Sequence, residues 1–217
     1  MKPIVIARQL LDVVLAIPLF VLAPLLRPFH TRWGATSEEV HSVMPGDEYF
    51  PRAQFQATRA ITIDAPRSDV YPWIAQVGFG RAGFYSYDLL DSLGHPSAER
   101  VIPDLQAIEP GDWVPMSPTI NETTAFKLDS FEAPAWMLWR KPDSTWSWRL
   151  EAVGGGTRLV TRVRVVYDWK KPGGALLSVV LLEFGDFAMM RRMLKGIRRR
   201  AENEAILGAA AASEPAS

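Results

Sequence analysis

The feature that most constrains the fold is a series of short alternating segments between residues 111 and 169. Polar and apolar side chains alternate at a period of two, as in half-buried strands. The segments read "GDWVPM", "TAFKLDSF", "AWMLWRK", "STWSWRLEA" and "TRLVTRVRVVYDW". The glycines at 154–156 join the last two as a hairpin. Because this spacing leaves no room for crossover helices, the sequence predicts an antiparallel meander.

Helical patterns flank the meander. "TRAITID" at 58–64 predicts one earlier strand, and the residues that follow place Val70, Trp73, Ile74 and Val77 on one helix face. After the meander, residues 175–205 predict a long helix, apolar in its first half and basic in its second. The predicted class is therefore α+β.

The stretch "GFGRAG" at 78–83 matches the glycine pattern of a dinucleotide-binding loop. That pattern has meaning only when a strand precedes it and a helix follows. Here a predicted helix precedes Gly78, which suits a helix C-cap instead. We expect a tight link to a second short helix at 86–94, and no nucleotide site.

Composition excludes several classes of protein. The chain has 217 residues, 24 basic and 24 acidic, so its formal net charge is zero, which argues against a nucleic-acid partner. It has no cysteine, which excludes disulfides and thiolate chemistry. No zinc-protease or serine-hydrolase motif appears around its three histidines. We expect no metal and no cofactor.

The two ends differ from the middle. Residues 1–32 hold an apolar stretch interrupted by Arg8 and Asp12, which predicts a membrane-associated helix. Whether it spans the membrane, lies on it or packs on the domain stays open, as does the side of the membrane; the alternative location is cytoplasmic. Residues 33–57 are expected to connect this helix to a domain at 58–206, and the low-complexity tail at 207–217 to be disordered.

The chain resembles the START-related superfamily, which includes polyketide cyclase/dehydrase, lipid-transport and pollen-allergen proteins, and most closely a bacterial branch of it. The matching stretches cover most of residues 32–202: "RWGATSEEV", "PGDE", "RAITIDAP", "WIAQVG", "GFYSYD", "WSWRLEA", "GTRLVTRVR" and "MMRRMLKGIRRRAE". The resemblance implies the helix-grip fold, in which a curved antiparallel sheet wraps a long C-terminal helix around a ligand cavity. It carries over no catalytic motif.

Candidate site residues follow from that implied cavity. Tyr85, Tyr87 and Asp88 are the catalytic candidates, because a tyrosine can polarise a carbonyl and a desolvated aspartate can accept a proton. The competing interpretation is an ordinary helix start. The candidate ligand-binding residues are Trp73, Gln76, Tyr85, Tyr87, Trp136, Trp146, Trp148, Phe187, Met189, Met190 and Met193. For each tryptophan and methionine, plain core packing is the alternative.

Charged residues leave further choices open. Arg149 and Arg162 lie on predicted strands, where an inward side chain would bind an anionic group and an outward one would be solvated. The basic run at 191–200 suits either anionic lipid or a solvated helix face.

Three functions remain in competition. The first is binding or carriage of a hydrophobic small molecule, lipid or polyketide-like, at a membrane. The second is a cyclase or dehydratase acting on such a ligand, and the third is an interaction module whose cavity is filled by its own side chains. The expected partners are the small molecule and membrane lipid; the oligomeric state is open.

Overall fold

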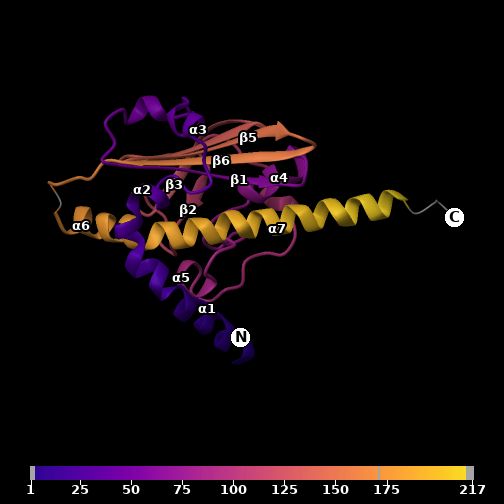
Figure 1. Cartoon of the computed structure of the whole chain (residues 1–217), viewed down its shortest axis with the longest axis horizontal. Helices are drawn as coiled ribbons and strands as arrows, with labels where there is room; N and C mark the ends of the chain where they lie inside the picture. Colours follow the sequence, from indigo (N-terminus) through magenta and orange to yellow (C-terminus); the bar gives the residue numbers. More distant parts are fainter. Residues whose placement is uncertain (1–2, 171, 214–217) are drawn as a thin grey trace.

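The computed structural model describes residues 3–170 and 172–213, and its centre is one antiparallel sheet in the order β1-β6-β5-β4-β3-β2 (Figure 1). The strands are β1 (Phe55–Ile63), β2 (Trp113–Pro115), β3 (Ala125–Glu132), β4 (Trp136–Lys141), β5 (Ser144–Val153) and β6 (Gly156–Val165). The meander predicted from the alternating segments is confirmed, and β1 completes the sheet beside β6.

A long C-terminal helix lies across the inner face of this sheet. α7 (Asp186–Ser213) packs against β1 and the short helix α4, as Figure 1 shows. The strand alternation turns one set of apolar side chains towards it, and Trp148, Leu150 and Leu159 in this set are almost fully buried. A sheet wrapped around a helix is the helix-grip architecture, so the predicted α+β fold is confirmed.

The segment between β1 and β2 lies beside α7 and helps to cover the inner face of the sheet. α4 (Arg67–Ala75) precedes the glycine loop, in which Gly78 and Gly83 pair with each other in a short bridge. α5 (Asp88–Asp91) follows, and η3 (Pro103–Leu105) lies in the loop that leads to β2. As predicted, a helix and not a strand leads into Gly78.

The N-terminal region covers two sides of the domain. The helices are α1 (Pro3–Leu22), η1 (Ala23–Leu26), α2 (Arg27–His30), α3 (Ser37–His41) and η2 (Asp47–Tyr49). α3 lies on the outer face of the sheet, opposite α7 (Figure 1). α1 contacts α5 and α7, and Asp12 forms an ion pair of 2.5 Å with Arg192. Residues 33–57, expected to be a connector, therefore include the outer cover of the sheet.

The helix after β6 has three parts. α6 (Pro172–Val180) is followed by η4 (Leu181–Gly185), one turn of π-helix, and then by α7. Single π-helical turns inside helices occur often at functional sites. α7 continues to Ser213, so helix occupies much of the 207–217 segment for which composition predicts disorder; residues 214–217 lie outside the described residues.

Candidate functional site

A cavity of about 370 Å³ lies between α7 and the inner face of the sheet. Its size falls within the usual range of small-molecule sites. The lining residues come from the α5 region, β3, the β4–β5 turn, β5, β6, α6, η4 and α7. They are Phe84, Ser86, Leu90, Asp91, Met116, Phe126, Lys141, Asp143, Ser144, Trp146, Val163, Val165, Ser178, Leu181, Leu182, Asp186, Met189, Met190 and Met193. Most are apolar, so the cavity suits an apolar ligand.

Trp146 forms part of the sheet side of this cavity. Its ring stacks on Trp148 at a centroid distance of 5.1 Å and meets Trp139 edge-on at 5.1 Å. Its indole Nε1 donates a hydrogen bond of 2.9 Å to Thr161 Oγ1, so the polar atom is already satisfied. Trp146 can therefore offer apolar surface to a ligand without leaving a buried donor unpaired.

Three methionines form the opposite wall. Met189, Met190 and Met193 come from one stretch of α7 and all line the cavity. Unbranched thioether side chains adapt to irregular ligands, which favours a site tolerant of ligand shape. These three residues and Trp146 are the sequence-predicted ligand candidates that the structure brings together.

Asp91 at the end of α5 is the cavity-lining carboxylate that sequence reasoning missed. Its Oδ2 accepts a hydrogen bond of 3.1 Å from the backbone N–H of Tyr87. Its Oδ1 is buried and has no hydrogen-bond partner among the residues that the structure describes. Burial raises the pKa of Asp91 to about 7, because it disfavours the charged form. Its spacing from Asp88 does not single it out, because the four residues of α5 give too little periodicity to assign a helix face.

The other charged groups in the lining have partners. Lys141 Nζ lies 3.1 Å from Asp143 Oδ1 across the β4–β5 turn. Asp186 Oδ2 lies 2.6 Å from the guanidinium of Arg59, which is 1% exposed and also donates to the His30 carbonyl at 2.7 Å. These pairs leave Asp91 as the lining carboxylate without an ion-pair partner among the described residues.

Trp73, Gln76 and Tyr85 lie together in the core and outside this lining. Tyr85 Oη donates to the Trp73 carbonyl at 3.0 Å and accepts from Gln76 Nε2 at 2.9 Å. Gln76 Oε1 accepts from the backbone N–H of Ile102 at 2.9 Å. Burial raises the pKa of Tyr85. These hydrogen bonds hold the loop between α4 and α5 in place. They also occupy the Tyr85 hydroxyl and the Gln76 amide, which are therefore not free to bind a ligand.

Tyr87 and Asp88 face the N-terminal helix. The Tyr87 ring lies 5.7 Å from Phe20 and 4.4 Å from the Arg192 guanidinium, at the junction of α1 and α7. Asp88 Oδ1 accepts a hydrogen bond of 2.6 Å from Ser97 Oγ. Neither residue lines the cavity.

The remaining candidates also lie outside the lining. Trp148 is fully buried behind Trp146, and Phe187 packs against His30 at 5.6 Å. Trp136 pairs with Arg149 across the β4–β5 ladder and donates to Glu132 at 3.3 Å. Its place in the alternation puts Trp136 on the outer face of the sheet.

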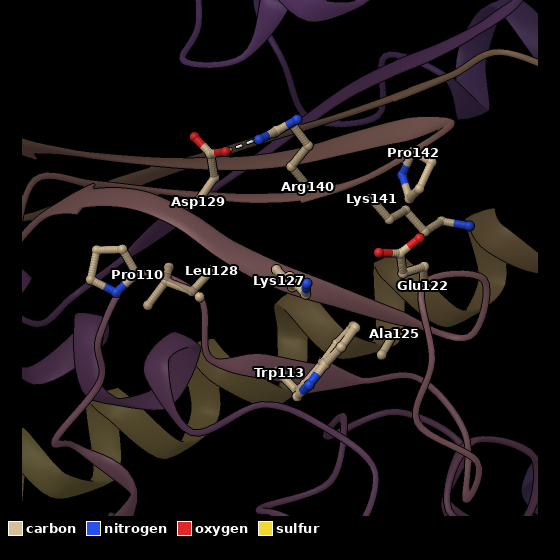
Figure 2. A pocket seen from close by; sticks show the side chains of 11 residues that line it. Pro110, Trp113, Glu122, Ala125, Lys127, Leu128, Asp129, Arg140, Lys141 and Pro142 are labelled. Carbon is tan, nitrogen blue, oxygen red and sulfur yellow. Dashed lines mark hydrogen bonds and ion pairs between the residues drawn. The ribbon is translucent and has the colours of Figure 1, made fainter.

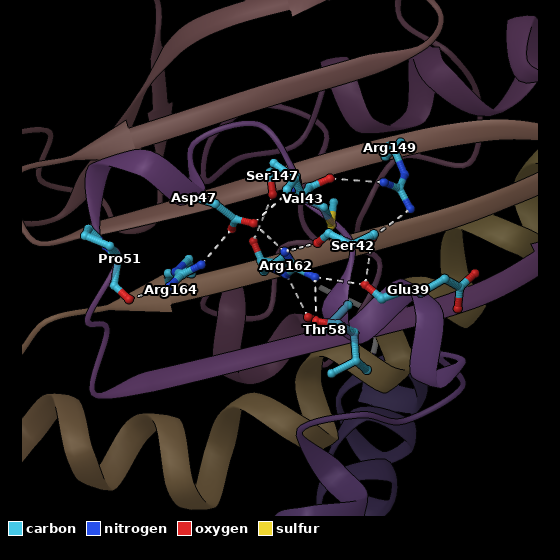
Figure 3. A network of polar contacts seen from close by, with 12 residues as sticks. Glu39, Ser42, Val43, Asp47, Pro51, Thr58, Ser147, Arg149, Arg162 and Arg164 are labelled. Atoms are coloured by element: carbon cyan, nitrogen blue, oxygen red, sulfur yellow. Dashed lines mark hydrogen bonds and ion pairs between the residues drawn. The ribbon is translucent and has the colours of Figure 1, made fainter.

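Arg162 takes neither of the two positions considered from the sequence. It points to the outer face, yet α3 and η2 cover it, so that it is 2% exposed. Figure 3 shows its guanidinium in a polar network, paired with Asp47. Its further acceptors are Thr58 Oγ1 and the carbonyls of Glu39, Val40 and Ser42, at 2.8 to 3.0 Å. This network anchors the N-terminal segment and has no contact with the cavity.

A second hollow, of about 480 Å³, lies on the outer face near β2, β3 and β4 (Figure 2). Lys127 lies 4.6 Å from the Trp113 ring centroid, and Asp129 pairs with Arg140 at 2.6 Å. Lys127, Asp129, Arg140 and Lys141 thus already pair with another charge or an aromatic ring, and Glu122 is exposed to solvent. The cavity beneath α7 is therefore the better candidate site.

No family model and no curated protein sequence matches the chain. Solved structures do resemble it. The Polyketide_cyc-like protein Cgl2372 from Corynebacterium glutamicum is 15% identical over 69% of this chain and 92% of its own, with a TM-score of 0.44. CalU16 from Micromonospora echinospora is 16% identical over 70% and 87%, with a TM-score of 0.33. The di-domain ARO/CYC BexL of the BE-7585A biosynthetic pathway is 15% identical over 71% and 53%, with a TM-score of 0.39.

At these identities the likeness concerns the fold alone. The function is therefore argued from the residues of this chain.

Proposed function

We propose that the protein binds and carries a hydrophobic small molecule, a lipid or polyketide-like compound, in the cavity beneath α7. The observation that carries this proposal is the lining itself: an aromatic wall at Trp146 faces three adaptable methionines across about 370 Å³. Burial of apolar ligand surface there contributes about 25 cal/mol per Å². Most of the polar side chains in the lining are already engaged by other residues, as Lys141, Asp143 and Asp186 are, which favours binding over multistep chemistry.

We further propose that the protein works at a membrane surface. Apolar side chains are exposed along α1 and on α6–η4, among them Leu15 at 70% and Leu177 at 59%. An ion pair of 2.9 Å between Arg27 and Glu183 holds the two surfaces side by side. Exposed apolar area of this extent is typical of a membrane or partner contact.

The helix lengths allow a second membrane arrangement. Two stretches, Ile4–His30 and Pro172–Leu207, are long and apolar enough to cross a bilayer. The second includes α7, which packs on the sheet. The first packs one side on α5 and α7 through Asp12 and Ala16, which favours α1 lying in the membrane interface rather than crossing.

Binding of the neutral fluorescent probe N-phenyl-1-naphthylamine tests the cavity. We expect wild type to bind it and Ser178→Trp, which fills the cavity from α6, to lose binding. Val180→Trp is the matched control, because Val180 is exposed on the same helix and outside the lining. A wild type that binds no apolar probe, or equal loss in both variants, would contradict the proposed site.

One observation favours the cyclase or dehydratase alternative. A carboxyl with a pKa of about 7 suits a general base, and Asp91 carries one in the cavity. It would remove a proton from a carbon next to one ligand carbonyl, and the enolate so formed would add through that carbon to a second carbonyl of the same ligand. The proton would then return from Asp91 to the alkoxide that this addition leaves. This role belongs to Asp91 rather than to Tyr85, Tyr87 or Asp88, which lie outside the lining.

A further inference from the structure

We propose that the Asp91 end of the cavity selects ligands whose head group is a neutral or cationic hydrogen-bond donor, and rejects anionic head groups. The preferred ligand is then an apolar body ending in an amine, hydroxyl or phenol. This inference rests on the proposed function and specifies which head group the bound ligand carries.

The first support is an unused acceptor. Asp91 Oδ2 accepts from the backbone of Tyr87, while Oδ1 is buried without a partner among the described residues. A buried acceptor without a hydrogen bond costs free energy comparable to a lost hydrogen bond. A ligand donor would supply the missing bond, and a charged donor would make it stronger.

The second support is the balance of charge in the lining. Lys141 is paired with Asp143, and Arg59 with Asp186, so neither cation is available to an anionic ligand. Asp91 has no such partner among the described residues, and Arg192, which faces it from α7, is paired with Asp12. A ligand carboxylate would therefore meet a like charge in a site of low dielectric.

The third support is the position of Asp91 in the cavity. It comes from α5 together with Ser86 and Leu90, whereas Trp146, Met190 and Met193 form the apolar walls. Ser86 lies close enough to Asp91 to lower its pKa, but its Oγ donates to the Met189 carbonyl at 3.0 Å. A hydroxyl has one proton to donate, so Asp91 Oδ1 remains without a donor among the described residues. An amphiphile can then bury its body against the walls while its head reaches α5.

The experiment compares four ligands that share one alkyl chain: octylamine, octanol, methyl octyl ether and octanoate. Their affinities for the full-length protein are measured by displacement of N-phenyl-1-naphthylamine. We expect wild type to prefer octylamine over octanoate by about tenfold or more, as a charge-assisted hydrogen bond allows. Octanol should bind more tightly than the ether, which has no donor.

Asp91→Asn is the informative variant, because the amide keeps the shape and loses the charge. We expect it to bring octylamine and octanoate to within about threefold of each other. Asp88→Asn is the matched control, since Asp88 lies on the same helix but outside the lining; it should keep the wild-type ranking. If Asp91→Asn also keeps the ranking while the probe still binds, the head-group inference is wrong and the apolar cavity stands. If the probe does not bind wild type, the proposed function itself fails.

A second measurement needs no variant. Octylamine stays protonated between about pH 8 and pH 6, whereas Asp91, with a pKa of about 7, gains its proton there. Affinity for octylamine should fall by about tenfold over that range. Lys141, Asp143 and Asp186 also line the cavity, and the charges of Asp88 and Arg192 act on Asp91 from outside the lining, so octanol serves as the uncharged reference. An octylamine affinity that follows octanol at every pH would overturn the inference.

Discussion

Gly196 on α7 packs directly against the backbone of Tyr85. A Cβ atom at Gly196 would overlap the Tyr85 carbonyl oxygen and crowd its Cβ. Tyr85 itself adopts a φ of 58°, an uncommon left-handed conformation for a residue with a side chain. This contact sets how closely the long helix approaches the loop between α4 and α5.

We expect Gly196→Ala to destabilise the protein by about 2 kcal/mol, because overpacking outweighs the gain in helix propensity. The measurement is the free energy of unfolding in urea. Gly185→Ala is the control, since a Cβ there meets only the Met189 sulfur at 3.8 Å. Equal effects of the two substitutions would show that α7 can shift without cost.

The Asp47–Arg162 pair should contribute far more to the free energy of unfolding than the Asp129–Arg140 pair, although both lie on the outer face of the sheet (Figures 2 and 3). Asp47→Asn leaves the buried Arg162 charge without its carboxylate partner, which should cost about 3 kcal/mol of unfolding free energy. Asp129→Asn should cost less than about 1 kcal/mol, because Arg140 is 45% exposed. Similar costs would mean that water reaches Arg162.

Truncation of the N-terminal segment also tests whether the network around Arg162 stabilises the domain. A chain that starts near Arg52 lacks the backbone carbonyls of Glu39, Val40 and Ser42 that accept from Arg162. We expect it to lose cooperative unfolding, whereas connecting segments can usually be removed without such loss. A truncated chain as stable as the full one would restore the view of residues 33–57 as a connector.

Strand alternation made the sheet predictable. The same alternation indicates the direction of Arg59. Arg59, Ile61 and Ile63 are two residues apart along β1, so all three side chains point to the inner face of the sheet. What pairs with Arg59 could not be read from the pattern, because Asp186 is far away in sequence. For Arg162 the alternation left the choice between inward and outward open, and its burial on the outer face depends on a segment more than a hundred residues earlier.

The candidate site was predicted less well than the fold. Helical spacing placed Met189, Met190 and Met193 on the closing helix, and alternation placed Trp146 inward. Tyr85, Tyr87 and Asp88 follow a loop whose backbone turns them to other neighbours. One further turn along α5 brings Asp91 to the cavity, and a helix of four residues gives too little periodicity to show this.

Asp91 should also make stability depend on pH. Burial raises its folded pKa to about 7, above the unfolded value of about 3.9, so the folded state binds the proton more tightly. Stability from this group is fully present below about pH 4, falls as the pH rises and is lost by about pH 7. We therefore expect the stability of Asp91→Asn relative to wild type to be greater at pH 8 than at pH 5, by urea unfolding at both values. An advantage of equal size at both would argue against titration of Asp91.

The membrane proposal predicts an effect confined to one side of the protein. Leu15→Glu on α1 and Leu177→Glu on α6 each place a charge within the exposed apolar surface. We expect each to weaken binding of the full chain to vesicles of phosphatidylcholine and phosphatidylglycerol by about tenfold, through lost apolar burial. Leu207→Glu is the matched control: Leu207 is 70% exposed but lies near the far end of α7. Binding should also weaken with salt, because basic residues lie on these helices, such as Arg8 within α1 and Lys195 on α7, and each contributes about 1 kcal/mol near an anionic surface. If all three variants sediment with vesicles as wild type does, the apolar surface is not a membrane contact. If wild type resists extraction by alkaline carbonate, α1 crosses the bilayer and its placement in the interface is wrong.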